Sequence, residues 1–328
     1  MKKTLVAIAA AAAVTGAMAE STLYGWVDQS HNTTTTTKSG TASTTNTWGA
    51  DNAASSAIGV KGEEDLGDGL KATYLMELGV DAETSTANGK NRQSYVGLTG
   101  GFGDVKIGQQ YTPLFNAYAA VDPSGISGHG GFIKLASGQQ GNGFYYNTPS
   151  MSGFSAVLGL HEGGTADSTT GNVTTYGLSY TNGPVYLFVA QETTKNGTST
   201  VGLNTTTIGS TAGDLTVTQG TASYDMGVAK IGLVTENMSS TASSGGSAKE
   251  TTLTLSAPFG ALLVGAEFSN GSYTDISGDS YNMTSSGLIA NYSLSKKTMI
   301  YFRYGVTNDA DNTTTKQTVT ALGLMVNF

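Results

Sequence analysis

Apolar and polar residues alternate along most of the chain from Ser21 to Phe328, which is the pattern of β-strands with one apolar face. The same alternation recurs in the segments 154–161, 175–181, 252–257, 300–306 and 321–328. The residues between the apolar ones are small or polar, so the second face suits contact with water. The chain is therefore predicted to be all-β.

The alternating runs are about 8–12 residues long, close to the roughly 9–11 residues of a tilted transmembrane strand and longer than an ordinary strand of about 5–6. Short connections are expected at 63–68, 99–103, 148–153, 182–184, 225–227, 258–260 and 293–297. Long polar connections are expected at 31–51, 82–90, 112–141, 162–172, 194–213, 238–248, 269–280 and 307–317.

A soluble β-sandwich and a membrane barrel both fit alternation alone. The regular change between short and long connections favours a transmembrane barrel, which has short turns at one end and long loops at the other. Seven short and eight long connections predict a 16-stranded antiparallel barrel with both chain ends on the short-turn side. The polar tips at 33–37 and 239–247 are expected to be solvated and mobile.

The first nineteen residues have a different character. Lys2 and Lys3 precede an Ala-rich apolar run, and Ala17-Met18-Ala19 closes it. This is the organisation of a secretory signal peptide, and the run is shorter than a transmembrane helix requires. We expect residues 1–19 to be removed and residues 20–328 to form one domain.

Composition narrows the function further. Of the 328 residues only 12% are charged, about half the usual share, and the net charge of −8 becomes about −10 once Lys2 and Lys3 are removed. An acidic chain is a poor nucleic-acid binder. Cysteine is absent and histidine occurs three times without ligand spacing, so neither a metal site nor a cofactor is predicted.

The sequence offers little support for three alternative functions. An outer-membrane enzyme needs a nucleophile and a base within reach of each other, and no such motif is present, so no catalytic residue is predicted. An adhesin or β-solenoid would show a fixed repeat of about 20–50 residues, and none is found. A substrate-selective channel would need an aromatic ladder or a dense basic cluster along its lumen, whereas only Tyr24, Trp26 and Tyr301 offer inward aromatics.

Several segments resemble a known family. They are Leu23–Asp28, Ile58–Ala72, Arg92–Leu98, Gly108–Pro113 and the terminal Phe328. In order and spacing they resemble the trimeric general porins of β-proteobacteria. The resemblance implies an outer-membrane location in a Gram-negative bacterium, passive diffusion of small hydrophilic solutes and ions, and a homotrimer among lipids and lipopolysaccharide. It also implies that the third external loop, 112–141, folds into the lumen and that Phe328 is read by the assembly machinery.

Alternation selects the side chains that face the lumen, where a charge avoids the cost of about 2–4 kcal/mol at mid-membrane. With apolar neighbours turned to lipid, the cations expected inside are Lys61, Lys71, Lys106 and Arg92, the last with Gln93 and Tyr95 directed outward. By resemblance, Arg92 and Lys61 are assigned to the constriction, and Lys71 and Lys106 lie nearer the short-turn mouth. The remaining pore residues are expected to be Asp28, Asp122, Lys134 and Tyr146.

The family usually has a wall richer in arginine. Here only Arg92 and Arg303 follow the signal segment, and Tyr146 and Gln109 stand where relatives carry basic residues. Inward acids are expected at Asp28, Glu77, Asp104 and Glu267. The field across the pore is therefore predicted to be weak, with a slight preference for cations.

Overall fold

The computed structural model describes residues 21–49, 55–81, 86–124, 135, 138–163, 171–201, 203, 206–209, 213–243, 245–310 and 315–328. The first strands are β1 (Thr22–Lys38), β2 (Thr41–Gly49), β3 (Ala57–Gly67), β4 (Leu70–Asp81), β5 (Thr86–Gly100), β6 (Gly103–Tyr111), β7 (Gln139–Asn147), β8 (Phe154–His161), β9 (Val173–Asn182) and β10 (Val185–Thr194). The later strands are β13 (Leu215–Asp225), β14 (Lys230–Ser240), β15 (Ser247–Phe259), β16 (Leu262–Thr274), β17 (Ser280–Ser293), β18 (Thr298–Asp309) and β19 (Thr315–Asn327). The other described elements are α2 (Pro113–Ala119) and the hairpin strands β11 (Thr198–Val201) and β12 (Thr206–Gly209).

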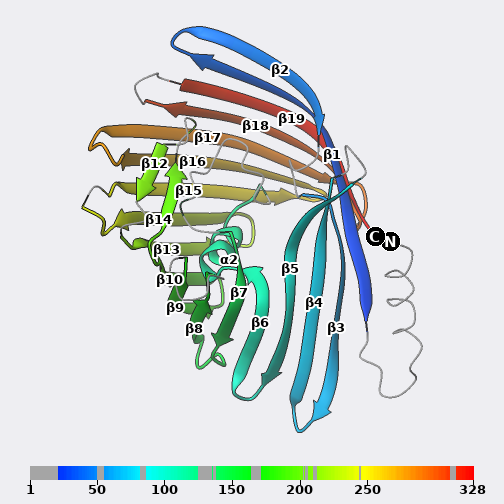
Figure 1. The fold of residues 1–328 in the computed structure, drawn as a ribbon. Helices are drawn as coiled ribbons and strands as arrows, with labels where there is room; N and C mark the ends of the chain where they lie inside the picture. The colour runs from blue at the N-terminus through cyan, green and yellow to red at the C-terminus, as the bar shows by residue number, and fades with distance from the viewer. Residues whose placement is uncertain are drawn as a thin grey trace.

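All of these strands except β11 and β12, which form a separate hairpin, belong to a closed antiparallel barrel (Figure 1). Each wall strand pairs with its sequence neighbour, and β1 closes the ring by pairing with β19. β1 pairs with β3 through its first residues and with β2 through its last, so β2 and β3 together fill one position of the wall. In the described residues the ring thus has the sixteen strand positions that the sequence predicts.

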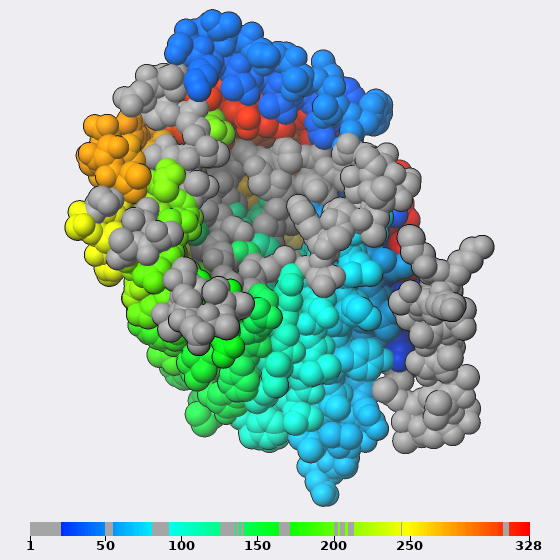
Figure 2. Space-filling view, viewed as in Figure 1, coloured from blue at the N-terminus to red at the C-terminus, as the bar shows by residue number. Residues whose placement is uncertain are grey.

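The two faces of the wall follow the alternation in the sequence. Along β13, Val217, Gln219 and Thr221 are buried inside the barrel, and Thr218 and Gly220 between them are partly exposed. The neighbouring strand β14 buries Val234 and Glu236 while Leu233 remains exposed. Polar groups inside and apolar groups outside are the inverse of a soluble protein and suit a wall between lipid and water. The space-filling view shows the hollow that this wall surrounds (Figure 2).

Tight turns join the strands at the short-turn end. Between β3 and β4, Gly67, Asp68 and Gly69 all have positive φ. Gly103 begins β6 with φ +110, and a Cβ there would stand 2.1 Å from the carbonyl oxygen of Asn147. Glycine is needed because this conformation and this close approach leave no room for a side chain.

The wall extends beyond the predicted strand ends at the opposite side. The segment 31–51 was predicted to be a solvated loop, but Thr33–Thr37 continues β1 and pairs with both β2 and β19. A tight turn at Ser39-Gly40, both with positive φ, reverses the chain. Threonine is β-branched and suits a strand even where both faces meet water, which is why a polar run forms a hairpin here.

The predicted signal segment, 1–19, lies outside the described residues. Among the helices that the structure does describe, none combines the length and apolar character of a membrane span.

Candidate functional site

Arg92 lies at the centre of a polar cluster on the inner face of the early strands. Its Nε donates to Oε1 of Glu77 at 2.6 Å, and its Nη2 donates to the hydroxyl of Tyr111 at 2.5 Å. The guanidinium stands 5.3 Å from the centre of the Trp26 ring. Glu77 also accepts a hydrogen bond of 2.8 Å from the Tyr24 hydroxyl. The positive charge of Arg92 is therefore compensated by the buried Glu77 carboxylate.

The direction of Arg92 depends on a β-bulge. The register between β4 and β5 shifts after Glu77, because Glu77 pairs with Gln93 and Leu78 pairs with Asn91. Arg92 is the extra residue, and a bulge re-aims a side chain. Tyr95 was predicted to face lipid, but its ring lies 5.2 Å from Nζ of the inward Lys106. Simple alternation assigns Arg92 and Tyr95 to opposite faces of β5. The extra residue of the bulge reverses this assignment, so both side chains lie on the same face.

The three lysines predicted to face the lumen each have a partner. Lys61 is exposed, with its Nζ 5.1 Å from the centre of the Tyr24 ring. Lys71, the second residue of β4, pairs with Glu63 at 2.7 Å, and both side chains are exposed. Lys106 pairs with Asp104 at 3.0 Å. The positive charge of the three lysines is therefore partly compensated by acids or by aromatic faces.

The segment after β6 begins with the short helix α2. Thr112 caps it by accepting a hydrogen bond of 3.1 Å from the Phe115 amide, and Pro113 occupies the first turn, where its missing N–H costs nothing. Leu114 and Ala117 are buried in a cluster with Phe188 of β10 and other inner-wall residues. The capping and packing residues thus fix the helix against β10 and β13.

Beyond α2 the chain is tied to three further strands. Lys230 of β14 donates to the carbonyl oxygen of Ala120 at 2.6 Å, and Thr254 of β15 donates to that of Val121 at 2.8 Å. Arg303 of β18 donates to the carbonyl oxygen of Ser124 at 3.0 Å. Residues 113–124 therefore contact the wall at β10, β13, β14, β15 and β18.

Asp122 belongs to this segment. Its Oδ1 accepts a hydrogen bond of 2.6 Å from the Ser124 amide. The Asp122 carboxylate also acts electrostatically on the Tyr118 hydroxyl. Burial raises the pKa of Tyr118 well above its ordinary value, and the Asp122 carboxylate adds to the effect. Tyr118 therefore stays neutral, and it packs against Val121 and against Val234 of β14.

The remaining predicted pore residues have different positions. Asp28 is fully buried on the inner face and accepts a hydrogen bond of 2.5 Å from the Tyr301 hydroxyl. Tyr146 shares a face with exposed Leu158 and donates to the Phe102 carbonyl oxygen at 2.7 Å, so in this structure it does not line the lumen. Its neighbour Tyr145 is the buried inner residue, because neighbouring side chains of a strand alternate. Lys134 lies outside the described residues.

The sequence did not predict a pair of acidic residues on the inner face of β14 and β15. Glu236 and Glu250 are direct cross-strand partners on β14 and β15, and both are buried. Glu236 Oε2 accepts a hydrogen bond of 2.7 Å from the Leu135 amide. Alternation along β14 and β15 would have placed both carboxylates inside, but only the pairing register brings them together. Within the part of the chain that the structure describes, His, Asp and Glu side chains form no group of three that could hold a metal ion.

Comparison with known proteins gives consistent results. Residues 4–312 match the family model described as Gram-negative porin. Outer membrane porin protein 32 of Delftia acidovorans is 34% identical over 253 residues, which span 70% of this chain and 68% of that protein.

Two solved structures show the same fold. The anion-selective porin from Comamonas acidovorans superposes with a TM-score of 0.76 at 23% identity, covering 95% of this chain and all of that chain. The outer membrane protein OmpT of Vibrio cholerae, in its trimer form, superposes with a TM-score of 0.67 at 16% identity, covering 94% of this chain and 99% of that one.

Proposed function

The chain belongs to the family of Gram-negative porins, and we propose that it forms a weakly ion-selective channel for small hydrophilic solutes. Its relatives are outer-membrane channels rather than enzymes, and this chain likewise is an outer-membrane barrel for passive diffusion. The observation that carries the proposal is the closed ring of strands whose inner face bears polar and charged side chains. Such a face holds water, and water-filled barrels pass solutes that are small enough.

The constriction is proposed to lie between the early strands and the inserted segment 112–141. Arg92 and Lys61 would stand on one side, and the segment that holds Asp122 on the other. Support comes from the hydrogen bonds that tie residues 120–124 to β14, β15 and β18. A loop fixed across the inner face narrows the pore and gives it a size limit.

Weak selectivity with a slight preference for cations is supported by the pairing of the lumen cations. Arg92, Lys71 and Lys106 each stand within 3.0 Å of a carboxylate oxygen. Several buried acids, including Asp28, Glu192 and Glu236, also lie on the inner face. Compensated cations and an excess of acids leave little field to attract anions.

A homotrimer embedded in outer-membrane lipids and lipopolysaccharide is part of the proposal. The trimer form of the Vibrio cholerae OmpT barrel supports it. Phe328 is proposed as the signal read by the assembly machinery. It is half exposed, and its amide donates to the Gly25 carbonyl oxygen at 3.0 Å where β19 meets β1.

Single-channel recording of the purified protein in a planar bilayer tests the function. We expect stepwise conductance that closes in three equal steps per insertion, and a reversal potential across a KCl gradient that is small and of the sign for cations. Absence of any conductance would refute the channel. Single closing steps would refute the trimer, and a clear anion preference would refute the selectivity.

A further inference from the structure

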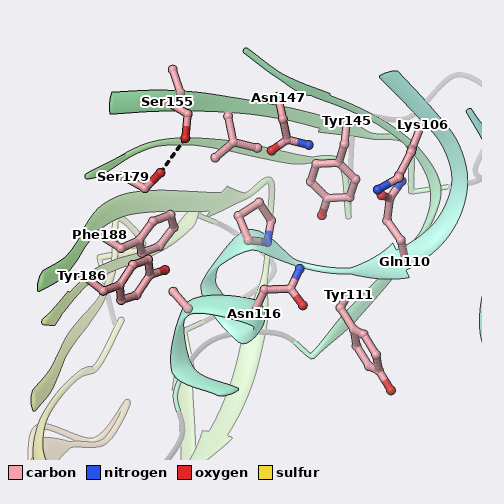
Figure 3. A pocket seen from close by; sticks show the side chains of 14 residues that line it. Lys106, Gln110, Tyr111, Asn116, Tyr145, Asn147, Ser155, Ser179, Tyr186 and Phe188 are labelled. Atoms are coloured by element: carbon pink, nitrogen blue, oxygen red, sulfur yellow. Dashed lines mark hydrogen bonds between the residues drawn. The ribbon is translucent and has the colours of Figure 1, made fainter. Parts of the chain in front are cut away.

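A cavity of about 210 Å³ lies between α2 and the inner faces of β6–β10 (Figure 3). Its polar lining includes Gln110, Asn116 and Asn147, and its aromatic lining includes Tyr145, Tyr186 and Phe188. Since a water molecule occupies about 30 Å³ of liquid, the space equals roughly seven waters. It is smaller than the pockets of drug-sized ligands and suits one small solute.

Two buried polar groups of the lining have no hydrogen-bond partner among the described residues. They are Nε2 of Gln110 and the hydroxyl of Tyr145, and their side chains are 6% and 2% exposed. The Tyr145 ring is held in position edge-on to the His161 ring at 4.6 Å. A buried polar group without a partner destabilises the protein, so such groups in a cavity indicate a ligand or ordered water that completes them.

The charge of the cavity excludes a strongly ionic ligand. Lys106 contributes the one basic side chain to the described lining, and its Nζ is paired with Asp104 at 3.0 Å. The other polar groups are amides and hydroxyls, including the Ser155 and Ser179 hydroxyls that bond to each other at 2.7 Å (Figure 3). Amides and hydroxyls donate and accept equally well.

Aromatic rings supply the apolar part of the cavity lining. Tyr186 and Phe188 lie on one strand, β10, and present apolar surface beside these amides and hydroxyls. A solute that fits has hydroxyl groups on its edges and apolar C–H groups on its faces. We propose that this cavity is a binding subsite for a neutral monosaccharide or polyol on its way through the pore, which rests on the proposed channel function.

Blocking of the channel current by sugar tests the subsite. Glucose added to single channels in KCl should interrupt the current in a saturable way. Tyr145→Phe and Gln110→Leu each remove one unpartnered group, and the half-saturating glucose concentration should rise about fivefold for each, as expected for one hydrogen bond. Tyr146→Phe is the matched control, since its hydroxyl bonds the Phe102 carbonyl oxygen and is not part of the lining. This control should leave the half-saturating concentration unchanged.

Charged analogues of the same size decide the class of ligand. Gluconate and glucosamine should block the current more weakly than glucose. Stronger block by gluconate, or equal block in Tyr145→Phe and in the parent, would overturn the proposal.

Saturation-transfer NMR of glucose with the protein in detergent measures binding without any current. A signal that Tyr145→Phe weakens and Tyr146→Phe leaves unchanged supports the subsite even if no conductance is found, and in that case only the channel function fails. The absence of a signal for glucose, ribose and glycerol would overturn the subsite while leaving a conducting channel intact.

Discussion

Arg92 and Glu77 form the most buried of the ion pairs in the described residues, with side chains 20% and 5% exposed. Arg92→Gln leaves the negative charge of Glu77 without its partner, and Glu77→Gln leaves the positive charge of Arg92 without its partner. A unit charge about 8 Å from an ion in water is worth roughly 0.5 kcal/mol. Because this energy has opposite signs for cations and anions, we expect the ratio of cation to anion permeability to rise about fivefold in the first variant and to fall about fivefold in the second, measured as the reversal potential in a KCl gradient.

The double variant Arg92→Gln with Glu77→Gln is the internal control for this pair. Because both charges are removed together, its reversal potential should return close to that of the parent. Lys71→Gln disrupts an exposed pair at the short turn and should have a smaller effect, since water screens it. Equal reversal potentials in the parent, the two single variants and the double variant would show that Arg92 and Glu77 do not lie at the constriction.

Gly103 allows the turn between β5 and β6. Its φ is +110, and an added Cβ would stand 2.1 Å from the Asn147 carbonyl oxygen, which is fixed by the strand pairing. Gly103→Ala should lower the free energy of unfolding by about 1–3 kcal/mol. Gly101→Ala is the control, because a Cβ at that position has no atom within 4 Å, and it should change stability by less than about 0.5 kcal/mol.

Urea unfolding in detergent, followed by tryptophan fluorescence, measures both glycine variants. Equal unfolding midpoints would mean that the turn rearranges at no cost and that the glycine is not needed there.

At the level of elements, the segment that follows α2 is fixed by few hydrogen bonds. Thr254, only 2% exposed, donates to the Val121 carbonyl oxygen at 2.8 Å. Thr254→Val keeps the shape and removes the donor, which costs about 1 kcal/mol. We expect larger fluctuations of the open-channel current because the segment moves more freely. Thr235→Val on the outer face of β14 makes the same chemical change away from the segment, and equal noise in both variants would contradict this role.

Local alternation was enough to predict the strands and the sixteen wall positions, because side-chain direction in a strand is set by neighbouring residues. The sequence did not predict the bulge at Arg92, since a bulge is defined by the register with the partner strand. It also misjudged Thr33–Thr37, whose strand is stabilised by pairing with β19, nearly three hundred residues away in sequence. The position of the segment after α2 also could not be predicted, because it depends on contacts between residues far apart in sequence, such as the hydrogen bond from Arg303 to Ser124.

For the whole molecule, the sparse charge follows from the architecture. An outward face in lipid excludes charge, so the 12% of charged residues gather in the lumen and at the two ends. In the lumen, acids and bases lie close together and cancel, as Arg92 and Lys106 do with their carboxylates. The barrel can therefore be strongly acidic overall and still present a weak field to a passing ion.

Closure of the barrel brings Phe328 to the first strand, and its ring lies against the space left by Gly25. If the ring is chiefly a signal for the assembly machinery, Phe328→Ser should lower the amount of folded barrel in the outer membrane several-fold, while refolding of the purified protein into detergent stays near normal. Phe259→Ser is the matched control, because Phe259 also ends a strand at the short-turn side and is also exposed, at 63% against 51% for Phe328. Heat-modifiable migration on gels measures the folded fraction in both settings. An equal loss for the two variants in cells, or a loss for Phe328→Ser in detergent as well, would mean that the ring stabilises the barrel seam rather than guiding its assembly.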